Sequence, residues 1–255
     1  LKEQNQTNKS NTEESVNTNF KSNYVHLHNN SQFSVLQSTT KISDLVKKTA
    51  EYKMNAVALT DKANMMGCFH FYRAVKNYND ELSNKDQIIK PILGCELNVC
   101  DNRLDKSYRD DGYQIVFLAK NKLGYENLMK MCSIGYTEGF YYVPRIDKDL
   151  VKKYKEGIIV LSGSKYGEIS NKIINVGEKQ ALEACIWWKE NFMNDFYLEM
   201  NIHGEEENEI INTQLLKFSK NHNIKLIATN DTKYISKEDA NAHDILLCVK
   251  DGQQQ

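Results

Sequence analysis

The sequence predicts an α/β domain built around a mainly parallel sheet. Short apolar runs, some of them continuous as in residues 158–161, alternate with segments of helical periodicity. A continuous apolar run is typical of a strand buried on both faces, and strands that alternate with helices usually pair in parallel. We expect seven strands, over residues 24–28, 56–60, 92–99, 114–119, 157–161, 196–200 and 225–229. Seven such units favour a distorted barrel, although a doubly wound sheet fits the same pattern.

Local signals place one helix after the first predicted strand and another after the seventh. Apolar residues recur at helical spacing from Ile42 to Ala50, with Ser43 as a candidate N-cap. Ser236 followed by Asp239 predicts a capping arrangement ahead of a helix over residues 240–249.

The first 23 residues differ in composition from the rest of the chain. They are rich in Asn, Ser, Thr, Glu, Lys and Gln and offer almost no apolar surface, so we expect a disordered linker over 1–23. The folded domain is expected over 24–252, and residues 253–255 would begin a connection to a following segment. The first residue is Leu1 rather than Met, which indicates a fragment.

Composition excludes several classes of function. The 255 residues carry a net charge of −1, without the basic excess typical of a general clamp on nucleic-acid phosphates. No run approaches the roughly 18 apolar residues needed to span a membrane. None of the six cysteines forms a C-x-x-C pair, which disfavours a structural zinc site and indicates reduced thiols in a cytoplasmic protein.

Polar residues gather where the predicted strands end, which is where parallel barrels carry their chemistry. His26 and His28 are two residues apart on the first strand, so both rings are expected on one face. Two carboxylates, Glu96 and Asp231, follow at the third and seventh strands, and Glu199 and His203 follow at the sixth. A set of two histidines and two carboxylates predicts a site for a divalent cation, although each residue alone has a structural explanation.

Several sequence blocks resemble the PHP (polymerase and histidinol phosphatase) domain of bacterial DNA polymerase III alpha subunits. The blocks are residues 25–34 (VHLHNNSQFS), 56–61 (AVALTD), 90–96 (KPILGCE), 138–147 (EGFYYVPRID), 161–163 (LSG), 228–231 (ATND) and 238–247 (EDANAHDILL). The Asn-rich linker and the Trp187-Trp188 pair are similar to alpha subunits of the Bacteroidetes group.

The resemblance implies a fold, a setting and partners. It implies a distorted TIM-like (βα)7 barrel at the N-terminus of a DNA-directed DNA polymerase. The polymerase active site, with its Mg²⁺, would lie beyond residue 255. The implied partners are the rest of the alpha chain, a proofreading exonuclease or another replisome subunit, and DNA through the complete polymerase.

The resemblance also implies a metal pocket that is only partly kept. Four ligand positions keep a ligand, namely His26, His28, Glu96 and Asp231, and together they resemble one complete site for Zn²⁺, Mn²⁺ or Fe²⁺. Five positions are replaced, by Gln37, Lys62, Gln114, Ser164 and Lys233. Arg145 is a candidate to pair with a carboxylate or phosphate in the pocket, although a structural ion pair explains it at least as well. His203 is a candidate to contact a phosphate or orient a ligand, although a plain loop residue is the favoured explanation. No residue is assigned a catalytic role.

Two interpretations of the replaced positions follow. Protonated lysine has no lone pair and cannot bind a cation. We hypothesise that Lys62 and Lys233 supply the charge of a lost metal; the alternative is that both point into solvent. A structural and interaction domain is therefore expected, with an active phosphoesterase or 3′–5′ exonuclease as the alternative. A small-molecule phosphatase is disfavoured by the polymerase-type blocks.

Overall fold

The computed structural model describes residues 24–83 and 87–253. The linker predicted for residues 1–23 lies outside the described residues. The strands are β1 (Ala56–Leu59), β2 (Lys90–Cys100), β3 (Tyr113–Ala119), β4 (Arg145–Asp147), β5 (Ile158–Leu161), β6 (Phe196–Met200) and β7 (Lys225–Ala228). The helices are α1 (Ile42–Glu51), α2 (Cys68–Glu81), α3 (Lys122–Thr137), α4 (Lys148–Lys153), α5 (Glu168–Asn175), α6 (Glu178–Phe192), α7 (Glu206–His222) and α8 (Ala240–Asp251).

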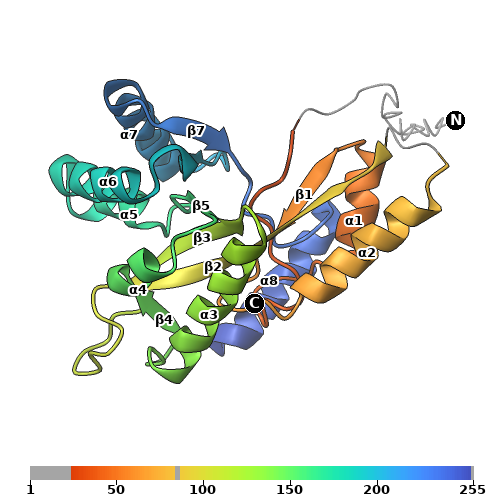
Figure 1. The fold of residues 1–255 in the computed structure, drawn as a ribbon, viewed down its shortest axis with the longest axis horizontal. Coiled ribbons are helices and arrows are strands. Elements are labelled where there is room, and N and C mark those ends of the chain that lie inside the picture. Colours follow the sequence, from red (N-terminus) through yellow and green to blue (C-terminus); the bar gives the residue numbers. More distant parts are fainter. Residues whose placement is uncertain (1–23, 84–86, 254–255) are drawn as a thin grey trace, which may run out of the picture.

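The strands form one mixed, curled sheet (Figure 1). Their order is β1-β2-β3-β5-β6-β7, and β4 pairs with β2 outside this path. β3 runs antiparallel to β2 and β5, and every other described pair of neighbouring strands is parallel. The expected α/β class with mainly parallel pairing is confirmed. The short strand β4 was not predicted, because three residues after a proline carry too little pattern to indicate a strand.

The segment that precedes Ser31 joins the two ends of the sheet. On one side, Ala58 N donates to His26 O and Thr60 N donates to Asn29 O, both at 2.9 Å. On the other side, Asn30 N donates to Thr232 O at 2.9 Å. These bonds connect β1 to the chain that follows β7. These bonds bridge the open side of the curled half-barrel into a ring, and Figure 1 shows the segment running between β7 and β1.

The strand predicted over residues 24–28 is wrong in detail. The segment has no regular ladder with either neighbour, only single backbone bonds and an isolated bridge between Asn29 and Thr232. A short edge segment shared between two neighbours gains too few ladder bonds to become a strand. At the helix ends, Ser43 is not a cap because α1 begins at Ile42 with Lys41 as its N-cap. The capping box of Ser236 and Asp239 is confirmed.

Apolar side chains fill both faces of the sheet. The largest cluster packs β2, β3, β5 and β6 against α3, α5, α6 and α7, around the fully buried Trp188. A second cluster lies between β1 and the helices α1 and α2. A third cluster lines the inside of the ring, where Ala58, Val116, Leu118 and Leu161 meet. Because side chains fill the interior, the polar residues at the strand ends lie above a packed floor.

One carboxylate in this core is neutralised by lysines. Glu168, at the start of α5, is 3% exposed. Its Oε1 accepts from Lys148 Nζ and Lys172 Nζ, each at 2.7 Å, and its Oε2 accepts from Trp188 Nε1 at 2.8 Å. Burial acts to raise the pKa of Glu168, but the two ammonium groups outweigh it, and the pKa is lowered.

We predict that Glu168→Gln lowers the free energy of unfolding by about 1–2 kcal/mol at neutral pH, because the lysines lose their shared anion. The lowered pKa means that the carboxylate stabilises the fold above its ordinary pKa. That contribution disappears as the pH falls through the lowered value. Urea unfolding at several pH values measures both effects. Glu183→Gln, at an exposed position of α6, serves as the control and should change little. Equal losses in the two variants would contradict the assignment.

Candidate metal centre

Three ligand atoms from distant parts of the chain meet at the mouth of the ring. His28 lies on the bridging segment, Glu96 lies in the middle of β2, and Asp231 follows β7. His28 Nε2 is 2.9 Å from Glu96 Oε2 and 3.3 Å from Asp231 Oδ1. The three atoms lie within 4.8 Å of one another. One imidazole nitrogen and two carboxylate oxygens suit a single divalent cation such as Zn²⁺, Mn²⁺ or Fe²⁺, so the donor set fits the expected metal.

The protonation of His28 follows from its partners. Its Nδ1 is 2.7 Å from Glu199 Oε1, and its Nε2 faces Glu96. An ionised carboxylate can only accept, so both ring nitrogens donate and His28 carries a positive charge. Burial by itself lowers the pKa of the imidazole. The carboxylates of Asp231, Glu199 and Glu96 outweigh it and raise the pKa well above its usual value.

The two carboxylates are held in the charged form. Burial acts to raise the pKa of each. In Glu96, the hydrogen bond from His28 and the charge of Lys62 outweigh burial, and the pKa is lowered. In Asp231, the charges of His28 and Lys233 lower the pKa far below its usual range. Both groups are therefore ionised at neutral pH, as ligands for a cation must be.

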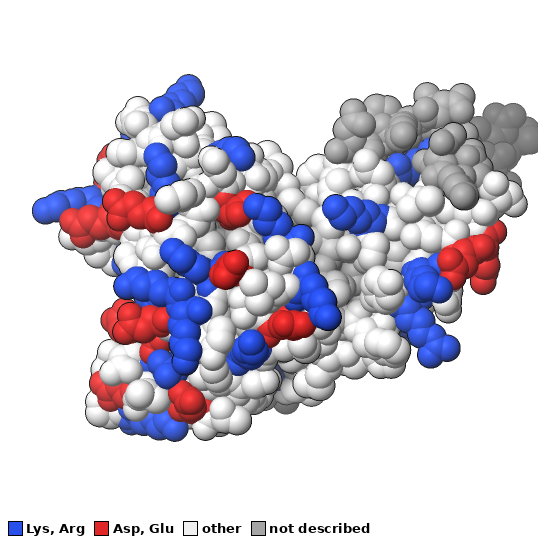
Figure 2. Space-filling view, in the orientation of Figure 1, with Lys and Arg blue, Asp and Glu red and all other residues white. Residues whose placement is uncertain are grey.

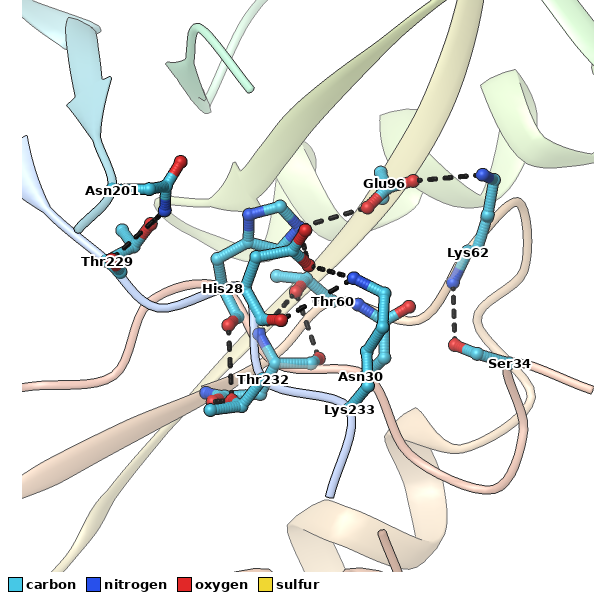
Figure 3. Close-up of polar contacts among 12 residues, drawn as sticks. His28, Asn30, Ser34, Thr60, Lys62, Glu96, Asn201, Thr229, Thr232 and Lys233 are labelled. Atoms are coloured by element: carbon cyan, nitrogen blue, oxygen red, sulfur yellow. Dashed lines mark hydrogen bonds and ion pairs between the residues drawn. The ribbon is translucent and has the colours of Figure 1, made fainter. Parts of the chain in front are cut away.

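Lysine side chains occupy the edges of this group (Figure 3). Lys62 Nζ is 3.6 Å from Glu96 Oε1, and Lys233 Nζ is 2.6 Å from Asp231 Oδ1. Their side chains are 21% and 29% exposed. With its nitrogen toward Glu96, the Gln114 amide donates to Oε1 at 3.2 Å and accepts from Lys62 Nζ at 2.6 Å. Three of the replaced positions thus contact the carboxylates directly.

The other two replaced positions differ from each other. Ser164 is buried, and its hydroxyl helps to lower the pKa of Asp231. It reaches that place through Gly163, where φ is +83° and an added Cβ would lie 2.1 Å from Gln114 O. Only glycine fits there. Gln37 lines the surrounding cleft, and its backbone carbonyl accepts from His243 Nε2 at 3.0 Å.

His26 lies apart from the group. It is not among the ligand atoms that converge on His28, Glu96 and Asp231. Its ring packs edge-on against Tyr24, with centroids 4.7 Å apart, and its buried Nδ1 has no hydrogen-bond partner. It lines a separate cavity of about 240 Å³. The rule that residues two apart share a face requires a regular strand, which this segment does not form.

Arg145 and His203 occupy contrasting positions. Arg145 is 1% exposed and donates to the backbone carbonyls of Gly139, Asp110, Arg103 and Asp105 at 2.9–3.2 Å. It ties the loop after β2 to the loop before β4 and does not line the cleft. Arg145 therefore contacts backbone carbonyls instead of forming the structural ion pair that the sequence analysis considered. His203 is exposed and lies on the rim of the cleft.

The group opens into a cleft of about 980 Å³. The cleft carries both signs of charge, with Lys62, Lys165, Lys233, Lys237 and Lys250 facing Glu96, Glu205, Asp231 and Asp251. On the molecular face drawn in Figure 2, basic side chains likewise lie beside acidic ones. This mixture agrees with the net charge of −1.

Sequence reasoning gave no role to Glu199, although it noted the residue at a strand end. Glu199 is 1% exposed and contacts His28 directly. The available signal was a carboxylate inside the otherwise apolar run of β6.

No helix among the described residues is long and apolar enough to cross a membrane.

The chain belongs to the PHP family, because the family model for the PHP domain matches residues 26–203. It is homologous to DNA polymerase III alpha subunits. It is 40% identical to that of Borreliella burgdorferi over 237 residues, which is 91% of this chain and 20% of the relative. The corresponding identities are 37% for Campylobacter jejuni and 36% for Aquifex aeolicus. The chain therefore spans about one fifth of these relatives.

Two solved structures share the fold. A putative metal-dependent phosphoesterase from Bifidobacterium adolescentis matches with a TM-score of 0.53 at 12% identity, covering 82% of this chain and 88% of the other. An amidohydrolase from Chromobacterium violaceum matches with a TM-score of 0.56 at 9% identity, covering 87% and 96%. At these identities the likeness shows the fold alone.

We predict that cation affinity rises with pH. A cation at this group must replace the proton on His28 Nε2, and the pKa of that ring is raised. Apparent affinity should therefore increase by up to about tenfold per pH unit and level off above the raised pKa. Competition with a chromogenic chelator, using Mn²⁺ from about pH 6 to about pH 8.5, measures this slope. An affinity that does not change with pH would show that His28 does not bind the cation.

Proposed function

We propose that this chain is the N-terminal PHP domain of a replicative DNA polymerase III alpha subunit, with a mainly structural and interaction role. Its pocket would hold at most one divalent cation. The observation that carries this proposal is the placement of Lys62 and Lys233 against Glu96 and Asp231. Each ammonium group neutralises a carboxylate that a second or third metal would need.

The role of a single cation would be to stabilise the fold. Binding to the folded form alone adds to stability by mass action. His28, Glu96 and Asp231 would hold the ion, and the ion would polarise a bound oxygen as a Lewis acid. Phosphoester hydrolysis generally uses a further ion to hold the attacking or leaving oxygen. The two lysines lie where they oppose that further ion.

Partners of this domain are proposed from the relatives and from exposed surface. The rest of the alpha chain, with its own Mg²⁺ site, a proofreading exonuclease and DNA bound through the complete polymerase are the proposed partners, in the cytoplasm. Helix α8 contains no buried residue, and Ile245 and Val249 on it are 43% and 64% exposed. Apolar positions of this kind support an interaction role.

A second candidate is an active metal-dependent phosphoesterase or 3′–5′ exonuclease. The observation that favours it is the convergence of His28, Glu96 and Asp231 at the floor of a cleft of about 980 Å³. A cleft of that size admits a nucleotide.

We predict that the full 255-residue chain binds about one cation or less after equilibration with trace Zn²⁺, Mn²⁺ and Fe²⁺. Elemental analysis of metal per chain measures this. The double variant Lys62→His and Lys233→His should gain metal and affinity, because it replaces two cations by two ligands. The matched control is Lys165→His and Lys237→His, which introduces the same ligands on the cleft rim and should gain nothing.

Two outcomes would contradict the proposal. Two or three tightly bound ions in the wild type, with hydrolysis of a 3′-terminal phosphodiester, would favour the phosphoesterase. No gain of metal in the Lys62→His and Lys233→His variant would refute the idea that these lysines supply a lost metal's charge.

A further inference from the structure

Glu199 is a buried carboxylate with an unusual set of partners. It is 1% exposed, and its Oε1 accepts from His28 Nδ1 at 2.7 Å. Within the described residues, His28 is its only ion-pair partner, and its Oε2 has no hydrogen-bond partner. Glu168, equally buried, is neutralised by two lysines instead. The charge of Glu199 is therefore directed at one imidazole nitrogen.

A chain of buried hydrogen bonds orients this carboxylate. Asn201 Nδ2 donates to Thr229 Oγ1 at 2.9 Å, as Figure 3 shows, and to Thr229 O at 3.0 Å. Because the hydroxyl accepts from Asn201, its own proton is free to donate to Glu199 Oε1, which it contacts. The backbone is fixed as well, since Glu199 N donates to Ser162 Oγ at 2.9 Å. Thr229 Oγ1 and His28 Nδ1 therefore both donate to Glu199 Oε1, where the chain that begins at Asn201 meets the imidazole.

The hydrogen bond between Nδ1 and Glu199 determines which ring nitrogen of His28 faces the cation site. With Nδ1–H committed to Glu199, only Nε2 remains to face Glu96 and Asp231, and the ring cannot flip without losing that bond. A second hydrogen bond of this kind sets the orientation of a metal-binding histidine and raises its basicity. Glu199 itself does not belong to the group of convergent ligand atoms.

We propose that Glu199 is a positioning residue for the cation site, which holds Nε2 of His28 toward Glu96 and Asp231 through the Asn201–Thr229–Glu199 chain. This inference rests on the single-cation site proposed above. It assigns to β6 and to the end of β7 a function that their burial alone does not indicate.

The test compares cation affinity with stability in matched variants of the full chain. Glu199→Met removes the acceptor at similar volume and should lower Mn²⁺ affinity by about 10–100-fold in chelator competition. Glu199→Gln keeps an acceptor oxygen and should lose less. Thr229→Val keeps shape but removes the hydroxyl, and a smaller loss is expected. Glu168→Gln is the control, because it should lower stability while leaving affinity unchanged.

A metal-free measurement separates this inference from the proposed site. Long-range ¹H–¹⁵N spectra report whether His28 Nδ1 carries a slowly exchanging, hydrogen-bonded proton. We expect that signal in the wild type, a weaker one in Thr229→Val and none in Glu199→Met. If the wild type binds no cation, the cation site fails, and the Nδ1 signal still decides whether Glu199 orients the ring.

Either of two results would overturn the inference. One is an Nδ1 signal that is unchanged in Glu199→Met. The other is a loss of affinity in Thr229→Val and Glu199→Gln that merely follows their loss of stability, as judged against Glu168→Gln.

Discussion

The backbone seam between β1 and the chain after β7 fixes the position of His28 in the pocket. Residues 26–30 bond to Ala58 and Thr60 on one side and to Thr232 on the other. Without these bonds the curled sheet would be open at that edge, and His28 would have no fixed position relative to β2. The same segment lies between the chain that carries Asp231 and β1, which pairs with the strand that carries Glu96.

Charge balance explains how so many ionised groups coexist there. Three carboxylates, Glu96, Asp231 and Glu199, face three cations, which are protonated His28, Lys62 and Lys233. The pocket is thus close to neutral before any metal enters. Exchanging the proton on His28 for one divalent cation changes the total by a single unit. A second divalent cation would leave an excess of positive charge that no described carboxylate in direct contact offsets. This imbalance is the physical basis for a one-cation pocket.

The apolar runs predicted six strands, β1, β2, β3, β5, β6 and β7, to within two residues at each end. The pattern failed at the edge segment with His26, where pairing with two different neighbours replaces a regular ladder. It also missed β4, which depends on contacts with β2 rather than on local sequence. In the site, the pattern of polar residues at strand ends predicted four residues together, of which His28, Glu96 and Asp231 converge and His26 does not. The contacts of Arg145 with four carbonyls and of Glu199 with His28 were not predicted, because both depend on loops and registers that periodicity does not encode.

The seam has a consequence for how the domain responds to mechanical load. His28 and Glu96 are separated by 68 residues, and Asp231 lies near the opposite end of the domain. A cation that coordinates all three would act as a cross-link that closes large loops in the chain, much as a disulfide does. The cation would link residues 24–30, where a pulling force from the N-terminal side would enter the domain, to β2 and to the segment after β7. The force needed to detach residues 24–30 from the sheet would therefore be greater with the cation bound than without it.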